Sequence, residues 1–147
     1  MDIIVTTPKS EMVNAQREAA DCLKAGSGQY FRVFRRSGSF PVFVGVGSRV
    51  YYVEDGFIRG FAIVASLGRG MRDTWGRREG FTCATTGRFY PCDSGGGVVF
   101  MNADSWQWIE PVPMKGFQNF RYPTFGRHSV KIVGGWRDPK PQVEGAR

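Results

Sequence analysis

Residues 49–64 read RVYYVEDGFIRGFAIV, and this stretch decides the fold. Two runs rich in β-branched and aromatic residues, 49–54 and 57–66, flank the dipeptide Asp55-Gly56. Asp-Gly between two such runs is typical of a two-residue β-hairpin, because a type I′ turn needs positive φ at both central residues. The sequence therefore predicts a tight antiparallel hairpin here.

Similar short runs occur on both sides of the hairpin, separated by glycine and proline. They predict strands at 2–6, 29–34, 97–101, 106–109 and 129–133. The body of the domain is therefore expected to be a β-sheet.

One helix is predicted, between Pro8 and Gly26. Thr7 can cap it, Pro8 suits its first position, and Glu11 lies in its first turn. Apolar residues then recur at helical spacing until Gly26: Met12, Ala15, Ala19, Cys22 and Leu23. The fold class expected is α+β, with one main N-terminal helix and a curved sheet.

The chain has 147 residues, of which 41% are hydrophobic, and this matches one ordinary domain. We expect this domain to cover 1–137 and a flexible Pro/Gly-rich tail to cover 138–147. The Gly/Arg-rich stretch 68–80 is expected to be a mobile surface loop. Three cysteines without a CxxC pair favour a reducing, cytoplasmic location, and no stretch approaches the ~18 apolar residues of a membrane span.

The net charge of +7 and the pI of about 9.7 favour a polyanionic partner. The partner expected from this charge is nucleic acid, either DNA or RNA.

The step Gly47-Ser48-Arg49-Val50, which opens the hairpin, and the run Gly60-Phe61-Ala62-Ile63-Val64 in its second strand resemble the PUA-like superfamily. That superfamily includes the PUA, ASCH and EVE domains. The resemblance implies a curved mixed sheet or pseudo-barrel and a module that binds nucleic acid or reads a modified or flipped base. The chain lacks the Gly-x-Lys-x-x-Glu-x-Arg motif of ASCH domains, so their chemistry is not carried over.

The segment 106–122 interleaves aromatic, amide and basic residues, a combination that can stack on bases, read base edges and neutralise phosphates. Trp106 and Tyr122 are the stacking candidates, and Gln118 and Asn119 are the candidate base-edge readers. Positive side chains that could hold the phosphate backbone or line the same cleft are Arg32, Arg49, Arg59, Lys115 and Arg121.

Structural alternatives exist for each of these residues. If 106–109 is a strand, Trp106 and Trp108 share one face, and at least one of them is expected to pack in the core. Arg32 could equally belong to an exposed sheet face on which cations provide solubility.

Catalytic signatures are weak. Asp93-Ser94-Gly95-Gly96 imitates the nucleophile motif of chymotrypsin-like proteases, but the sole histidine, His128, follows the serine instead of preceding it. No P-loop, dinucleotide fingerprint or zinc-ligand spacing occurs, so no cofactor and no metal are expected. The alternatives to a non-catalytic nucleic-acid binder are a small nuclease or amide hydrolase of PUA-like fold, and a phage or mobile-element protein that binds another protein.

Overall fold

The computed structural model describes residues 1–6, 23–24, 26, 28–34, 40–69, 80–82, 89–91 and 96–142. Most of the predicted helix lies outside these residues. Leu23 and Lys24 are helical, and Gly26 follows with a φ of 80° and donates its N–H to the Leu23 carbonyl over 3.1 Å. Within the described part of the chain, no helix is long and apolar enough to cross a membrane.

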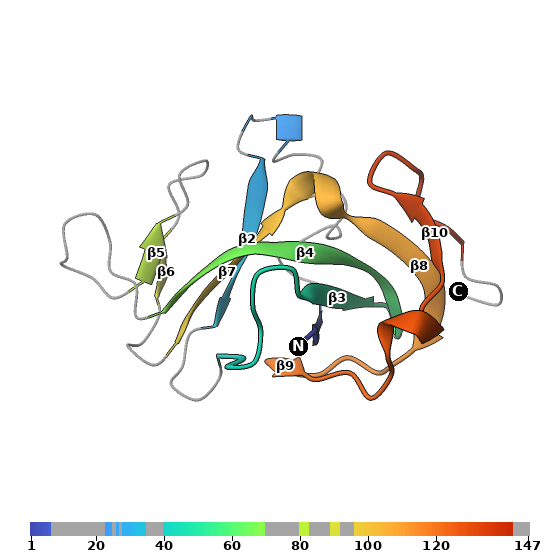
Figure 1. The fold of residues 1–147 in the computed structure, drawn as a ribbon, viewed down its shortest axis with the longest axis horizontal. Coiled ribbons are helices and arrows are strands. Elements are labelled where there is room, and N and C mark those ends of the chain that lie inside the picture. Colours follow the sequence, from blue (N-terminus) through green and yellow to red (C-terminus); the bar gives the residue numbers. More distant parts are fainter. Residues whose placement is uncertain are drawn as a thin grey trace.

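Most of the regular secondary structure in the described chain is β-strand (Figure 1). The strands are β1 (Ile3–Thr6), β2 (Gln29–Phe34), β3 (Arg49–Glu54), β4 (Phe57–Arg69), β5 (Gly80–Thr82), β6 (Phe89–Pro91), β7 (Gly97–Asn102), β8 (Gln107–Pro113), β9 (Phe120–Arg121) and β10 (Ile132–Gly135). Two single-turn 3₁₀ helices, η1 (Ala103–Ser105) and η2 (Arg127–Ser129), follow β7 and precede β10.

Strand β4 organises the sheet. Its first half pairs with β3 and β8, and its second half pairs with β7, so β4 arches over the molecule (Figure 1). The order β10-β8-β4-β3-β1-β9 continues from β4 through β7 to β2 on the other branch. β1 and β3 are parallel and the other pairs in this sheet are antiparallel, so the sheet is mixed. Because β4 arches and bridges the two branches, the sheet curls into a half-barrel (Figure 1).

Side chains join the two ends of the curl. Arg32 on β2 donates from Nη1 to the carbonyl of Thr6 at the end of β1, over 3.1 Å. The ring of Phe34, also on β2, packs edge-on against Phe120 of β9 with 6.0 Å between centroids. β2 therefore approaches β1 and β9 through side-chain contacts.

Both faces of the central strands are buried, and successive residues alternate between the two faces except where a bulge interrupts the register, as it does next to Arg59. The inner face forms the larger core, which includes Val5, Tyr52, Trp106 and Trp108. The outer face carries the smaller core: Ile4, Tyr51, Val53, Ile58, Phe61 and Ile109. Because both faces are covered, the strands read as continuous apolar runs.

The sequence-based prediction of the hairpin is confirmed. Asp55 and Gly56 have φ of 51° and 84°, the two positive values that a type I′ turn requires. The shared face of Trp106 and Trp108 is also confirmed, since both rings lie in the inner core. The strand predicted at 129–133 is displaced, because η2 occupies its start and β10 begins at Ile132.

Candidate nucleic-acid interface

Residues 111–137, here called the C-terminal strap, contain five lysines and arginines and no aspartate or glutamate. The strap covers the outer core, against which it places Val112, Met114, Phe117, Phe125 and Val130. These five apolar side chains are thus used for packing. The basic side chains are Lys115, Arg121, Arg127, Lys131 and Arg137, and all five residues are exposed.

The strap loop, residues 114–122, is fixed at both ends. The Met114 N–H donates to the Gly56 carbonyl over 2.9 Å, and the Phe117 N–H donates to Oγ1 of Thr6 over 3.0 Å. Further on, Phe120 pairs with Val5 in the β9–β1 ladder. Anchors on both sides preorganise the loop, which lowers the entropy lost when a ligand binds.

Between these anchors, Gln118 and Asn119 are exposed. Asn119 has a φ of 64°, a left-handed conformation that asparagine tolerates better than most residues. The two amide side chains therefore lie at an exposed bend of the backbone, where they can donate and accept hydrogen bonds.

Arg121 lies over the ring of Phe117, with 4.4 Å between its Cζ atom and the ring centroid. This stacking restricts the guanidinium while leaving Arg121 exposed. In the described part of the chain, neither Arg121 nor Lys115 forms an ion pair with a carboxylate. Their charges are therefore available to an anion from solution.

Two predicted site residues are buried. Trp106 is 0% exposed and packs against Tyr52 and Trp108, with centroids 5.8 Å and 5.2 Å away. Its assignment as a base-stacking residue is therefore corrected: it is a core residue. Arg59 is 6% exposed and donates from Nη2 to the carbonyl of Pro141, so it does not line an open cleft.

The other predicted residues lie in different places. Arg32 binds the Thr6 carbonyl at the junction of β2 and β1. The Cζ atom of Arg49 lies 4.1 Å from the Phe61 ring centroid, and its Nη1 donates to the Tyr51 hydroxyl over 3.1 Å. The structure thus brings together Lys115, Gln118, Asn119, Arg121 and Tyr122 in one loop, while Arg32 and Arg49 mainly serve local packing.

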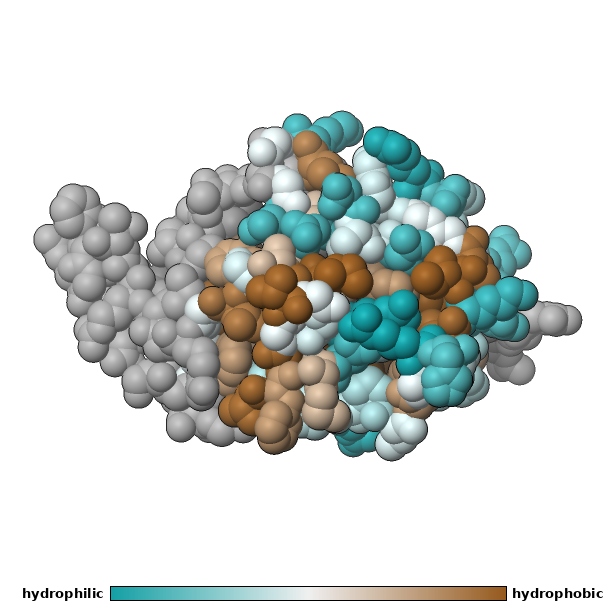
Figure 2. Space-filling model, viewed as in Figure 1, coloured by the Kyte–Doolittle hydropathy of each residue, from teal (hydrophilic) through white to brown (hydrophobic). Residues whose placement is uncertain are grey.

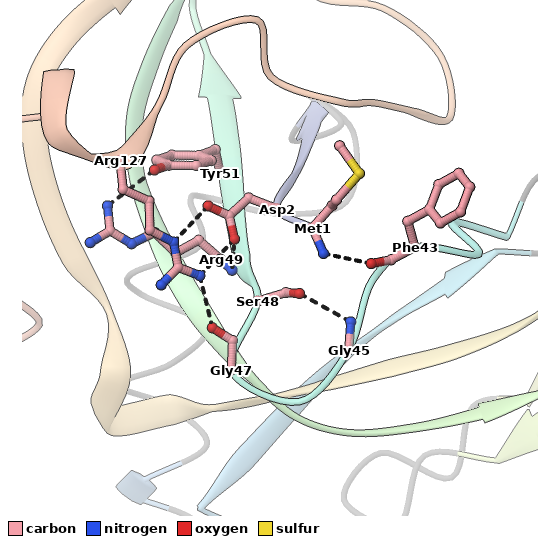
Figure 3. A network of polar contacts seen from close by, with 9 residues as sticks. All are labelled: Met1, Asp2, Phe43, Gly45, Gly47, Ser48, Arg49, Tyr51 and Arg127. Carbon is pink, nitrogen blue, oxygen red and sulfur yellow. Dashed lines mark hydrogen bonds and ion pairs between the residues drawn. The ribbon is translucent and has the colours of Figure 1, made fainter.

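Asp2 anchors the strap to the start of the chain (Figure 3). Its carboxylate accepts two hydrogen bonds from Arg127, of 2.9 Å and 2.7 Å, and a third of 2.8 Å from the Arg49 N–H. Burial alone would raise the pKa of Asp2, but the bonds from Arg127 and Arg49 outweigh it and the net pKa is lowered. The same hydrogen bonding raises the pKa of Arg127. Arg127 is therefore committed to a structural role.

An exposed apolar surface lies beside the strap loop. The apolar loop, residues 40–48, exposes Val42, Phe43 and Val46 by 60%, 63% and 74%. Phe43 also packs on the half-buried Tyr122, with 5.8 Å between ring centroids. Figure 2 shows apolar residues gathered over this region, next to strongly hydrophilic residues. The sequence signal was the apolar run FPVFVGV at 40–46, which falls in no predicted strand.

The described residues show no arrangement of side chains that supports the catalytic hypotheses. His128 is exposed in η2, whereas Ser94 and the cysteines at 22, 83 and 92 lie outside the described residues, as does most of the arginine-rich loop 68–80. Among the residues that the structure describes, no three His, Cys, Asp or Glu side chains are grouped to hold a metal.

Comparisons with protein-family models, with curated proteins and with solved structures found no match to this chain. The resemblance to the PUA-like superfamily therefore stays a prediction.

Proposed function

We propose that the chain is a nucleic-acid-binding module, and that the strap loop is its contact surface. One observation carries the proposal: a basic strap without carboxylates presents Lys115 and Arg121 unpaired beside two exposed amides, in the described structure. Unpaired cations bind phosphates with little competition, since no internal ion pair has to break first.

The groups in the loop suit a single-stranded or flipped nucleotide. Arg121 and Lys115 are suited to phosphate, and the amides of Gln118 and Asn119 can read the edge of an exposed base. Tyr122 is half-buried beside Phe43 and Phe120, so a base would stack on the part of its ring that stays exposed. We also propose that the chain is related to the PUA-like superfamily, and the curled mixed sheet supports this relationship. The proposal further includes recognition of a modified base and a cytoplasmic location.

The test is fluorescence anisotropy with labelled single-stranded DNA and RNA oligonucleotides at several salt concentrations. The double variant Lys115→Gln/Arg121→Gln should weaken binding and lower the logarithmic salt slope by about 1.4, because each lost contact to a single strand removes about 0.7. Lys140→Gln is the single-charge control, since this lysine is paired with Glu54 over 2.9 Å and lies outside the strap. Absence of binding by the wild-type chain at low salt would refute the proposal.

A second candidate function is binding to a protein, as in a phage or mobile-element factor. The exposed apolar loop favours it, because contiguous apolar surface on a small domain marks interaction sites. A pull-down from nuclease-treated lysate separates the two functions. Capture that survives nuclease and is lost in Val42→Ser/Phe43→Ser would favour the protein partner.

A further inference from the structure

The segment 138–142, here called the tail, lies against the β3–β4 hairpin and the inner-core residue Trp108. Three contacts hold it there. The Trp108 indole N–H donates to the Asp138 carbonyl over 3.2 Å, and the Lys140 ammonium lies 2.9 Å from Glu54. Arg59 donates to the Pro141 carbonyl. The predicted flexible tail thus begins with residues that bind the domain, and 143–147 lies outside the described residues.

The sheet prepares this site before the tail is considered. Glu54 follows Val50 and Tyr52 on the inner face of β3 by alternation. Arg59 reaches the same face because a bulge interrupts the β4–β8 register between Ile58 and Gly60. The result is a buried acceptor, a buried cation and an indole donor arranged at one end of the sheet.

Arg59 is incompletely satisfied by the tail. Its Nε atom is buried and has no hydrogen-bond partner, although Nη2 on the same edge binds the Pro141 carbonyl. Burial lowers the pKa of this guanidinium, while Glu54 and Asp55 raise it less. A guanidinium edge is matched by two oxygens held side by side, as in a carboxylate, whereas a peptide carbonyl supplies one.

The tail has the sequence and the contacts expected of a bound peptide. Its sequence, Asp-Pro-Lys-Pro-Gln, contains two prolines, which favour an extended backbone and donate no N–H to the sheet. The contacts that hold it are two backbone carbonyls and one lysine side chain, all of which another peptide can offer.

We propose that this site binds the C-terminal peptide of a partner chain that ends in Lys-Xaa, in exchange for the chain's own tail. The lysine side chain pairs with Glu54. The terminal carboxylate takes the place of the Pro141 carbonyl and presents two oxygens to the Nε and Nη2 atoms of Arg59. This ligand places an opposite charge beside both Glu54 and Arg59. Among the described contacts, the tail places an opposite charge, that of Lys140, only beside Glu54.

The experiment uses the full chain and the pentapeptide Arg-Asp-Pro-Lys-Pro, prepared as the free acid and as the C-terminal amide. Binding is followed by the fluorescence anisotropy of peptides labelled at their N-terminus. The free acid should bind at least about tenfold more tightly than the amide, the gain expected from a charge-assisted second hydrogen bond.

Two variants sharpen the result. Lys140→Ala weakens the competing tail, so the acid peptide should bind this variant more tightly than the wild-type chain. Arg59→Lys keeps the charge but loses the paired donors, so it should abolish the preference for the acid.

Failure of both peptides to bind Lys140→Ala, equal affinity for acid and amide, or a preference that survives in Arg59→Lys would each overturn the proposal. A concentration-dependent dimer dissolved by the peptide would assign the site to the tail of a second copy instead. None of these outcomes bears on oligonucleotide binding by the strap loop.

Discussion

Substitution of Gly60 by alanine should be strongly destabilising, because β4 and β8 meet without space at this residue. A Cβ atom there would lie 2.4 Å from the backbone oxygen of Gln107 and 2.5 Å from Cζ2 of Trp106. The Trp106 ring is enclosed by Tyr52 and Trp108, and the Gln107 carbonyl belongs to the paired strand, so neither can withdraw cheaply. We expect the free energy of unfolding to fall by about 3 kcal/mol, the upper part of the usual overpacking range.

The assay is chemical denaturation followed by far-UV circular dichroism, with thermal melts in parallel. For a chain of this size, about 3 kcal/mol lowers Tm by roughly 10 °C. Gly45→Ala is the matched control, since a Cβ atom at Gly45 has nothing within 4 Å and its φ is not in the left-handed region. It should change stability by less than about 1 kcal/mol.

A third variant tests the mechanism of this loss. Trp106→Leu creates a cavity, but it also removes the ring that a Cβ atom at Gly60 would meet. Gly60→Ala should cost less in the Trp106→Leu background than in the wild type, yet still be costly, because the Gln107 carbonyl remains. Equal stability of Gly60→Ala and Gly45→Ala would refute the close packing of β4 on β8. If Gly60→Ala caused no loss of stability in the Trp106→Leu background, the clash with the Gln107 carbonyl would be refuted.

Three further predictions concern the ion pair and the binding surface. Asp2→Asn should lower the free energy of unfolding by about 1–2 kcal/mol near pH 7. Because the pKa of Asp2 in the folded state lies below its ordinary value of 3.8, this difference from wild type should shrink as the pH falls below that value. Acid titrations of both proteins measure the change. Phe117→Leu keeps an apolar side chain but removes the ring beneath Arg121, so oligonucleotide affinity measured by anisotropy should weaken by about 2–5-fold, with an unchanged salt slope. Replacing Arg69, Arg72, Arg77 and Arg78 with serine should weaken binding to every oligonucleotide by a similar factor and flatten the salt dependence, and a loss selective for one sequence would contradict this.

Local chemistry explains which parts of the fold were predictable. The Asp55-Gly56 turn and the alternation of Trp106 and Trp108 depend on neighbours in sequence, so the pattern alone predicts them. β9 has two residues and exists because Phe120 and Arg121 pair with β1, more than a hundred residues earlier. No local signal identifies such a strand.

The candidate site shows the same division. The mixed composition of 115–122 was visible in the sequence, and the structure presents Lys115, Gln118 and Arg121 on one exposed loop. Strict alternation would place Arg59 on the same face as Phe61, but the bulge after Ile58 turns it inward. The burial of Arg59 therefore depends on a register shift and on contacts with the tail, neither of which the strand pattern encodes.

The most direct test of the central claim is to map backbone amide shifts in ¹H–¹⁵N spectra while a short single-stranded oligonucleotide is added at low salt. Binding by the strap loop predicts that the largest shifts occur at residues 115–122, together with the side-chain amides of Gln118 and Asn119. Shifts centred on the apolar loop, or no shifts at all, would contradict it.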